Sequence, residues 1–199
     1  MSFYEKFNPL TTVAKQRFVE TFTGDALDTD RWHQGTNSGS PTFRMSDSVD
    51  GGFEIFCDGT SDSGYINFDG IDQYNQTGSV IIGVAKPSTL TSMSMWLGFI
   101  QNTGAPFSLL RWHTTSYFNL ETSDGTATYT DSDISLNTDE HSVKIELTSS
   151  NNKLTLDGNL KITKTTNLPN GALEPFFRII SYNTTSKTAS IRYCEAYNT

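Results

Sequence analysis

The sequence predicts an all-β fold, a sandwich or jelly roll of two antiparallel sheets. About a dozen short apolar or alternating segments follow one another at intervals of about ten residues, each ending at Gly, Asp, Asn or Ser. No segment has the length and 3.6-residue period of a long amphipathic helix. The composition agrees, because 12% aromatic and only 18% charged residues suit strands with polar outer faces better than helical bundles.

The first residues differ from the remainder of the chain. Phe3 and Phe7 have helical spacing, but Pro9 interrupts it. Two interpretations stay open: a loosely ordered leader, or an arm whose aromatic side chains dock on a neighbouring subunit. We therefore divide the chain into an N-terminal arm, residues 1–17, and one domain, residues 18–199.

The strands that follow the arm show a period of two. Residues 17–22 (RFVETF) alternate before a Thr-Gly-Asp turn, and GGFEIFC places Phe53, Ile55 and Cys57 on one face. GSVIIGVAK and SMSMWLGFI are nearly continuous apolar runs, as in central strands buried on both faces. We expect Trp96, in the second run, to lie in the core.

The stretch HSVKIELTSSNNKLTLDGNLKI predicts three consecutive antiparallel strands. Val143, Ile145 and Leu147 alternate with polar residues, which predicts a half-buried strand. Asp157-Gly158, flanked by alternating apolar residues, predicts a two-residue hairpin in which both residues adopt positive φ. The later segments EPFFRIISY and ASIRYCEAY supply the last strands.

Charge and targeting signals exclude several classes of partner. A net charge of −8 and a pI near 4.7 argue against nucleic acid and against an anionic membrane surface, because both need clustered Lys and Arg. The chain shows no signal peptide and no apolar run of membrane-spanning length. We expect synthesis in the cytoplasm without an export signal.

Two cysteines are too few for a secreted disulfide framework. We therefore expect Cys57 and Cys194 to be free, buried thiols. A bridge between them stays open as the alternative, because the first and last strands of a sandwich often lie close together.

Three pieces of the chain together resemble the concanavalin A-like lectin/glucanase superfamily, which includes laminin G-like domains. They are FVETFTGDALDTDRWHQ near the start, HSVKIELTSSNNKLTLDGNLKITKTTNLP, and the last strand SIRYCEAYN. The resemblance covers nearly everything after residue 17, and it implies a jelly-roll sandwich in which the last strand lies beside the first. It also implies that Trp32 packs beneath the first turn. These pieces are fold markers, so the resemblance does not fix the activity.

Retaining glucanases of this superfamily carry two glutamates on one strand, spaced Glu-x-Asp-x-(x)-Glu, so that a nucleophile and an acid face each other. Glu54 and Asp58 share a strand face here, but Phe stands midway between them. Asp131 and Asp133, and the adjacent residues 139–140, also fail to match. No catalytic residue is therefore carried over from the family.

One stretch, LLRWHTTSYFNLE, has the residue types of a ligand site. If Trp112 points into the core, then Arg111 and His113 line the open face of the strand. Arg111, His113 and Tyr117 form the only cluster that suits a lyase-type site, and they are our candidate ligand-binding residues. Tyr74 and Tyr129 are further candidates for stacking on a sugar.

The histidines and acidic turns offer little for a metal. His33, His113 and His141 lack the spacing of a zinc site, and we expect His141 to pack or cap a strand start. No acidic residue closes an EF-hand loop after the turn FDGIDQYN. This turn nevertheless offers three candidate calcium ligands, Asp69, Asp72 and Asn75. We expect no cofactor, with a structural calcium ion as the alternative.

Similar short proteins, with an arm before such a sandwich and no export signal, occur among virion and appendage proteins of tailed phages. This resemblance implies a non-enzymatic particle-surface protein, such as a capsid decoration, fibre or adhesin subunit, displayed on a virus particle. It would form homo-oligomers and contact other particle proteins through the arm, with host glycans as ligands. The alternative is a polysaccharide-active enzyme of the same fold, either a glycoside hydrolase or a lyase. A purely structural subunit without a ligand is the third option.

Overall fold

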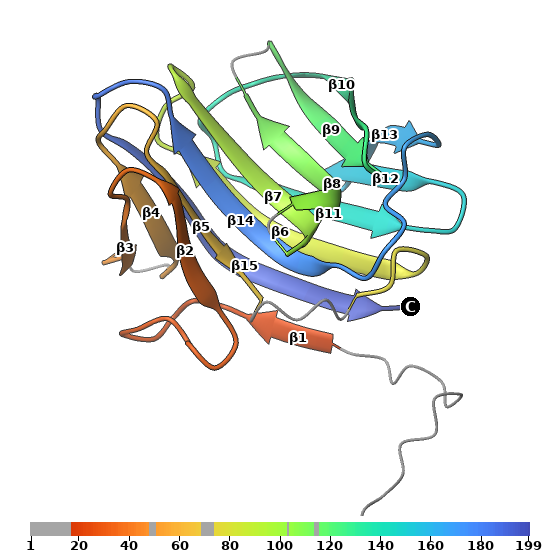
Figure 1. Cartoon of the computed structure of the whole chain (residues 1–199), viewed down its shortest axis with the longest axis horizontal. Helices are drawn as coiled ribbons and strands as arrows, with labels where there is room; N and C mark the ends of the chain where they lie inside the picture. Colours follow the sequence, from red (N-terminus) through yellow and green to blue (C-terminus); the bar gives the residue numbers. More distant parts are fainter. Residues whose placement is uncertain (1–16, 48–50, 69–73, 103, 114–115) are drawn as a thin grey trace, which may run out of the picture.

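The computed structural model describes residues 17–47, 51–68, 74–102, 104–113 and 116–199. These residues form fifteen β-strands and no helix, arranged as two antiparallel sheets packed face to face (Figure 1). The predicted all-β sandwich is therefore confirmed. No helix in this part of the chain could cross a membrane.

Eight strands form the first sheet, and its order follows the jelly-roll pattern in which strands distant in sequence are neighbours. β1 pairs with β15, so the last strand lies beside the first, as the family resemblance implies. In spatial order the sheet consists of β13 (Asn159–Lys164), β12 (Asn152–Leu156), β11 (His141–Leu147), β6 (Ser79–Pro87), β15 (Lys187–Asn198), β4 (Phe53–Cys57) and β3 (Thr42–Met45), with β1 (Arg17–Glu20) beside β15.

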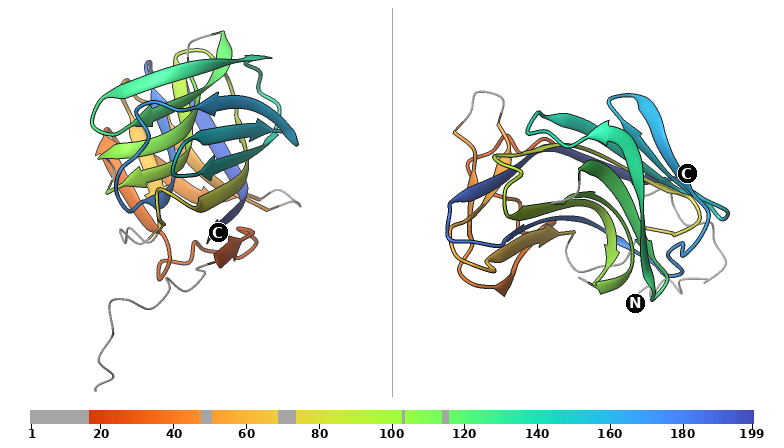
Figure 2. Two further views of the ribbon diagram at one scale, coloured as in Figure 1. Left: turned by 90° about the vertical axis from the view of Figure 1, so that its right-hand side faces the viewer. Right: turned by 90° about the horizontal axis from the view of Figure 1, so that it is seen from above.

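The second sheet has seven strands and curves strongly, so that one face is concave and the other packs on the first sheet (Figure 2). In spatial order it consists of β10 (Ala127–Ser135), β9 (Tyr117–Ser123), β8 (Gly104–Trp112), β7 (Met93–Gln101), β14 (Glu174–Ser181), β5 (Ser63–Asn67) and β2 (His33–Ser38).

The core lies between the two sheets and is built from alternate residues of facing strands. Leu97 of β7 and Ile145 of β11 are both buried, at 1% and 0% exposure. The sheets approach closely here, because a Cβ added at Gly83 of β6 would lie 2.6 Å from Leu97 Cδ2. Trp112 is also buried and packs edge-on against Phe118, with ring centroids 5.0 Å apart. Trp32 is buried as well, as the resemblance implies.

The predicted hairpin between β12 and β13 is confirmed. Asp157 and Gly158 have φ values of 49° and 78°, as a two-residue turn of this kind requires. The Asp157 side chain also fixes the start of β11, since its Oδ2 lies 2.6 Å from His141 Nδ1. His141 Nε2 lies 2.8 Å from Asn137 Oδ1, so this histidine packs at a strand start, as predicted.

The prediction for the two cysteines is confirmed, whereas the one for Tyr74 is wrong. Cys57 and Cys194 are free and buried, as predicted, and burial raises the pKa of the Cys57 thiol to about 11. Tyr74, a candidate for stacking on a sugar, is only 1% exposed and packs against Phe99 in the core, so it is not available to a ligand. An isolated backbone bridge joins it to Leu173.

Two predictions concern residues outside the described part of the chain. The N-terminal arm covers residues 1–17, of which only Arg17 is described. Asp69 and Asp72 of the acidic turn are likewise not described. Arm-dependent assembly and a structural calcium ion therefore stay predictions.

Replacing Ile145 by Ala tests the core between the sheets. The change removes buried methyl groups and leaves a cavity, so the free energy of unfolding should fall by about 2–5 kcal/mol. Denaturant unfolding measures it. The neighbouring Lys144→Ala change, on the outer face, should stay within about 0.5 kcal/mol. Equal losses in both variants would show that this strand is not packed as described.

Candidate functional site

Side chains alternate along each strand of the seven-stranded sheet. One set of positions points into the core, and the other set points to the concave face. In β7, Met95 and Leu97 point into the core, so Ser94 and Trp96 point to the concave side. The prediction that Trp96 lies in the core is therefore wrong. Its ring is half-buried and packs with a second, smaller apolar cluster that includes Phe176. The apolar run of β7 concealed this, because both of its faces carry apolar residues.

Five side chains form a line across this face, which we call the central row. Strand register places Trp96 opposite Arg178 of β14 and opposite Arg111 of β8. The register continues from Arg178 to Tyr65 of β5, and from Arg111 to Asn119 of β9. Paired residues in a sheet project to the same face, so the central row runs perpendicular to the strands at the middle of the concave face.

Two guanidinium groups flank the indole ring of Trp96. Arg111 Cζ and Arg178 Cζ each lie 4.7 Å from the ring centroid, one from each neighbouring strand. Such cation–π contacts contribute about 0.5–2 kcal/mol each when partly desolvated. Trp96 Nε1 donates a hydrogen bond to Ser94 Oγ at 2.8 Å, which fixes the orientation of the ring. The centre of the concave face is therefore an ordered, cationic platform.

The two arginines differ in their other partners. Arg111 Nη1 forms a short ion pair with Glu121 Oε2. Arg178 Nε donates to Ser63 Oγ at 2.8 Å, and no carboxylate among the described residues forms an ion pair with Arg178. Burial lowers the pKa of Arg178, but a guanidinium remains protonated at neutral pH. Glu121 therefore compensates one of the two positive charges beside Trp96.

A histidine and a tyrosine lie next to the central row. The rings of His113 and Tyr182 are 6.1 Å apart in an edge-to-face arrangement. Burial, followed by the charge of Arg111, lowers the pKa of His113, and Glu121 opposes this shift. The imidazole is therefore neutral at pH 7 and can accept a proton. Tyr182 is 42% exposed and offers a phenolic proton to a ligand on this face.

The structure brings together two of the three residues predicted as ligand-binding. Arg111 belongs to the central row, and the pKa of His113 responds to its charge. Tyr117 begins β9 two residues before Asn119, is 42% exposed, and shares the concave side with Asn119 by strand alternation. Sequence reasoning missed Trp96, Arg178, Tyr65 and Tyr182. The signal for Arg178 is that it is the only charged residue after the initial Glu174 in the otherwise apolar strand EPFFRIIS.

Glu174 and Asp133 of this sheet are each engaged with a neighbouring side chain. Glu174 is buried, and its Oε1 accepts a hydrogen bond from Asn67 Nδ2 at 2.8 Å. On the edge strand β10 the register shifts between Asp131 and Ser135, and Asp133 pairs at 3.5 Å with Lys161 of the other sheet. Among the described strands of the concave face, none aligns two carboxylates in the manner of a retaining glucanase.

The carboxylate pair considered from the sequence lies elsewhere. Glu54 is on the outer face of the eight-stranded sheet, where its Oε2 lies 2.7 Å from Arg44 Nη2. Asp58 follows the end of β4 and is exposed. Within the described ranges, no group of three or more His, Cys, Asp or Glu side chains is placed to hold a metal ion.

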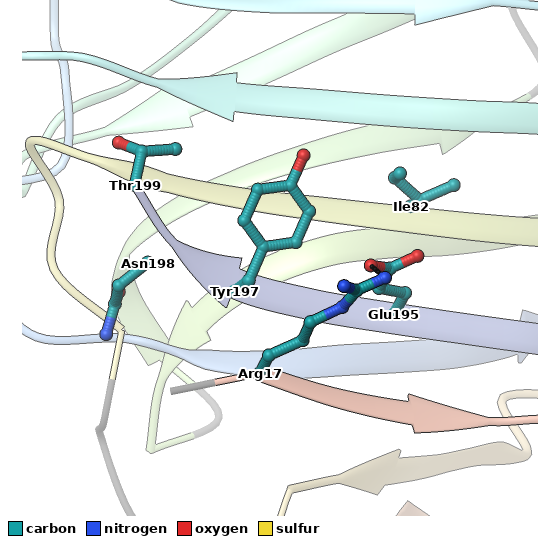
Figure 3. A pocket seen from close by; sticks show the side chains of 6 residues that line it. All are labelled: Arg17, Ile82, Glu195, Tyr197, Asn198 and Thr199. Carbon is teal, nitrogen blue, oxygen red and sulfur yellow. Dashed lines mark ion pairs between the residues drawn. The ribbon is translucent and has the colours of Figure 1, made fainter. Parts of the chain in front are cut away.

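A separate hollow of 440 Å³ lies beside β1 and β15, on the outer face of the eight-stranded sheet (Figure 3). Arg17 Nη2 and Glu195 Oε1 form an ion pair there at 2.8 Å, with Tyr197 beside them. Because Glu195 neutralises this arginine, the hollow offers less to a charged ligand than the central row does.

The titration of His113 tests the electrostatics of the concave face. Its pKa should lie below the usual value of about 6.5. Replacing Arg111 by Met removes a positive charge and should raise this pKa, whereas Glu121→Gln removes a negative charge and should lower it further. An NMR titration of the imidazole resonances measures both, with the signal assigned through His113→Gln. Shifts in the same direction, or none, would contradict the arrangement.

No family model matches the chain, and no curated protein matches it by sequence. Solved structures do match it. A β-glucanase of Bacillus licheniformis has a TM-score of 0.66 and 14% identity, over 92% of this chain and 98% of that one. A GlcNAcα1-4Gal-releasing endo-β-galactosidase from Clostridium perfringens has a TM-score of 0.66 and 13% identity. That match covers 96% of this chain but 63% of the endo-β-galactosidase chain.

A third solved structure comes from work on endo-acting O-glycanases with which members of the human gut microbiota initiate mucin breakdown. It has a TM-score of 0.69 and 12% identity, over 92% of this chain and 98% of that one. These neighbours contradict the prediction of a non-enzymatic particle-surface protein, and they favour its alternative, a polysaccharide-active enzyme. At such identities the likeness concerns the fold. The chain has the jelly-roll fold of the concanavalin A-like lectin/glucanase superfamily.

Proposed function

We propose that this chain is a polysaccharide-active enzyme that binds its substrate along the central row and cleaves a glycosidic bond there. The observation that carries the proposal is the central row itself. It crosses the concave face of a fold shared with a β-glucanase and an endo-β-galactosidase. We assign an activity like that of those two proteins to this chain only as a proposal.

The central row has the dimensions and chemistry of a glycan-binding surface. Five neighbouring strands at a spacing of about 4.8 Å give a row roughly 19 Å long, which accommodates several sugar units. Tyr65 offers an aromatic ring for the apolar face of a pyranose. Beside it, Arg178 adds directional hydrogen-bond donors.

His113 and Tyr182 are the proton-transfer pair of the proposed enzyme. A neutral imidazole accepts a proton from the substrate or from water, and the tyrosine hydroxyl donates one to the departing oxygen. A retaining hydrolase would instead need two carboxylates about 5 Å apart. Glu121 is held by Arg111, and Glu174 is buried against Asn67. These contacts favour proton transfer through the histidine and tyrosine.

Replacing His113 by Gln separates binding from cleavage. The change removes the proton acceptor and leaves the central row in place, so cleavage should fall by about 100-fold or more. Retention on the same polysaccharide should be unchanged. The assay incubates the protein with a panel of polysaccharides and scores retention, reducing ends and unsaturated ends together. Reducing ends alone indicate hydrolysis, and unsaturated ends indicate elimination.

The matched control is Lys86→Gln, which changes an exposed residue of β6 in the other sheet and should leave cleavage as in the wild type. Equal cleavage by His113→Gln and the wild type would remove His113 from the mechanism. No cleavage of any polysaccharide by the wild-type chain would overturn the proposed function.

A further inference from the structure

Arg178 differs from every other arginine of this protein. The chain has six arginines, all of them described, and the other five each form an ion pair with an aspartate or glutamate. Arg178 has no carboxylate partner among the described residues, although the chain carries a net charge of −8 and acidic residues outnumber basic ones by 22 to 14. An unpaired guanidinium in such an acidic chain requires an explanation.

The surroundings of Arg178 orient it toward a ligand. Its Nε is held by Ser63 Oγ at 2.8 Å, and its Cζ lies 4.7 Å from the centroid of the Trp96 ring. These two contacts fix the plane of the guanidinium and leave its terminal nitrogens without a hydrogen-bond partner in the described part of the chain. A planar pair of N–H donors in fixed orientation matches the oxygens of a carboxylate or sulfate.

Burial of this charge also favours an anionic partner. Removing a guanidinium from water without a counter-charge costs free energy, and the lowered pKa of Arg178 has that burial as its main cause. Arg111 does not relieve the cost, since it is a second cation beside the same ring. Glu121 is already engaged with Arg111. The missing negative charge can therefore come from the substrate.

We infer that the substrate is an anionic polysaccharide, and that Arg178 binds the carboxylate or sulfate of one sugar unit at the centre of the central row. This inference rests on the proposed function and names its substrate class. A general electrostatic attraction does not produce this preference, because the chain as a whole repels polyanions. Selectivity for an anion must come from the local cation.

The test measures dissociation constants for three immobilised polymers: a polyuronate, a sulfated galactan and an uncharged galactan. The wild-type chain should bind one of the two anionic polymers at least about tenfold more tightly than the uncharged one. A preference for the polyuronate identifies a carboxylate, and a preference for the sulfated polymer identifies a sulfate ester. Binding should weaken as salt is added.

Arg178→Met should lose this preference, with an affinity for the anionic polymer roughly tenfold lower or more. Arg178→Lys keeps the charge without the planar fork and should recover part of it. Arg31→Met, which breaks a surface ion pair with Asp28, is the matched control and should behave as the wild type. Thermal unfolding of each variant verifies that it is folded.

The outcomes separate the inference from the proposed function. If the wild type binds and cleaves the uncharged polymer and has no preference for either anionic polymer, the inference is overturned and the proposed function stands. If the wild type neither binds nor cleaves any polysaccharide, the inference and the proposed function both fail. Loss of the anion preference in Arg178→Met, while Arg31→Met keeps it, supports the inference.

Discussion

The register between β14, β7 and β8 is the constraint on which both the core and the concave face depend. It places Trp96 between Arg178 and Arg111, and the same pairing sends Met95 and Leu97 into the core. Side chains alternate along a strand, so a slip of one residue would exchange the two sets completely. That exchange would bury two arginines between the sheets and expose the centre of the core. The cost of burying these charges therefore favours the native register in addition to the apolar contacts.

The concave face is held in shape by small contacts that act together. Ser94 orients the Trp96 ring, Ser63 holds Arg178, and a glycine makes room for the end of the central row. A Cβ at Gly35 would lie 2.0 Å from Tyr65 Cζ, so the tyrosine ring lies over β2 only because that position has no side chain. A surface held in this way before a ligand arrives loses less conformational entropy on binding.

Local patterns in the sequence predicted those parts of the fold that are determined locally. The Asp157-Gly158 hairpin was found because its turn chemistry requires two adjacent residues with positive φ. Arg111 and His113 were found because alternation opposite Trp112 assigns them to the open face. The sandwich followed from the spacing of the strands, without any knowledge of which strands pair.

The remainder of the site was hidden because it is assembled from distant segments. Trp96 and Arg178 are neighbours in the sheet but far apart in the chain, and only strand order reveals their contact. The apolar run around Trp96 has no alternation that would distinguish its two faces. The prediction for Tyr74 is wrong for a related reason, since its ring packs against Phe99 and its backbone is bridged to Leu173, both on distant segments.

The difference between the two faces of β7 also explains how a shared fold and an unshared site coexist. Packing between the sheets restricts the core side of the strand, where Leu97 lies so close to Gly83 that a Cβ there would be 2.6 Å from Leu97 Cδ2. No such packing restricts the concave side, so its side chains can change chemistry while the sandwich persists. Identities of 13–14% to the glucanase and the endo-β-galactosidase, at a TM-score of 0.66, agree with this division. The site therefore has to be argued from its own residues, among them Arg178, which has no carboxylate partner in the described part of the chain.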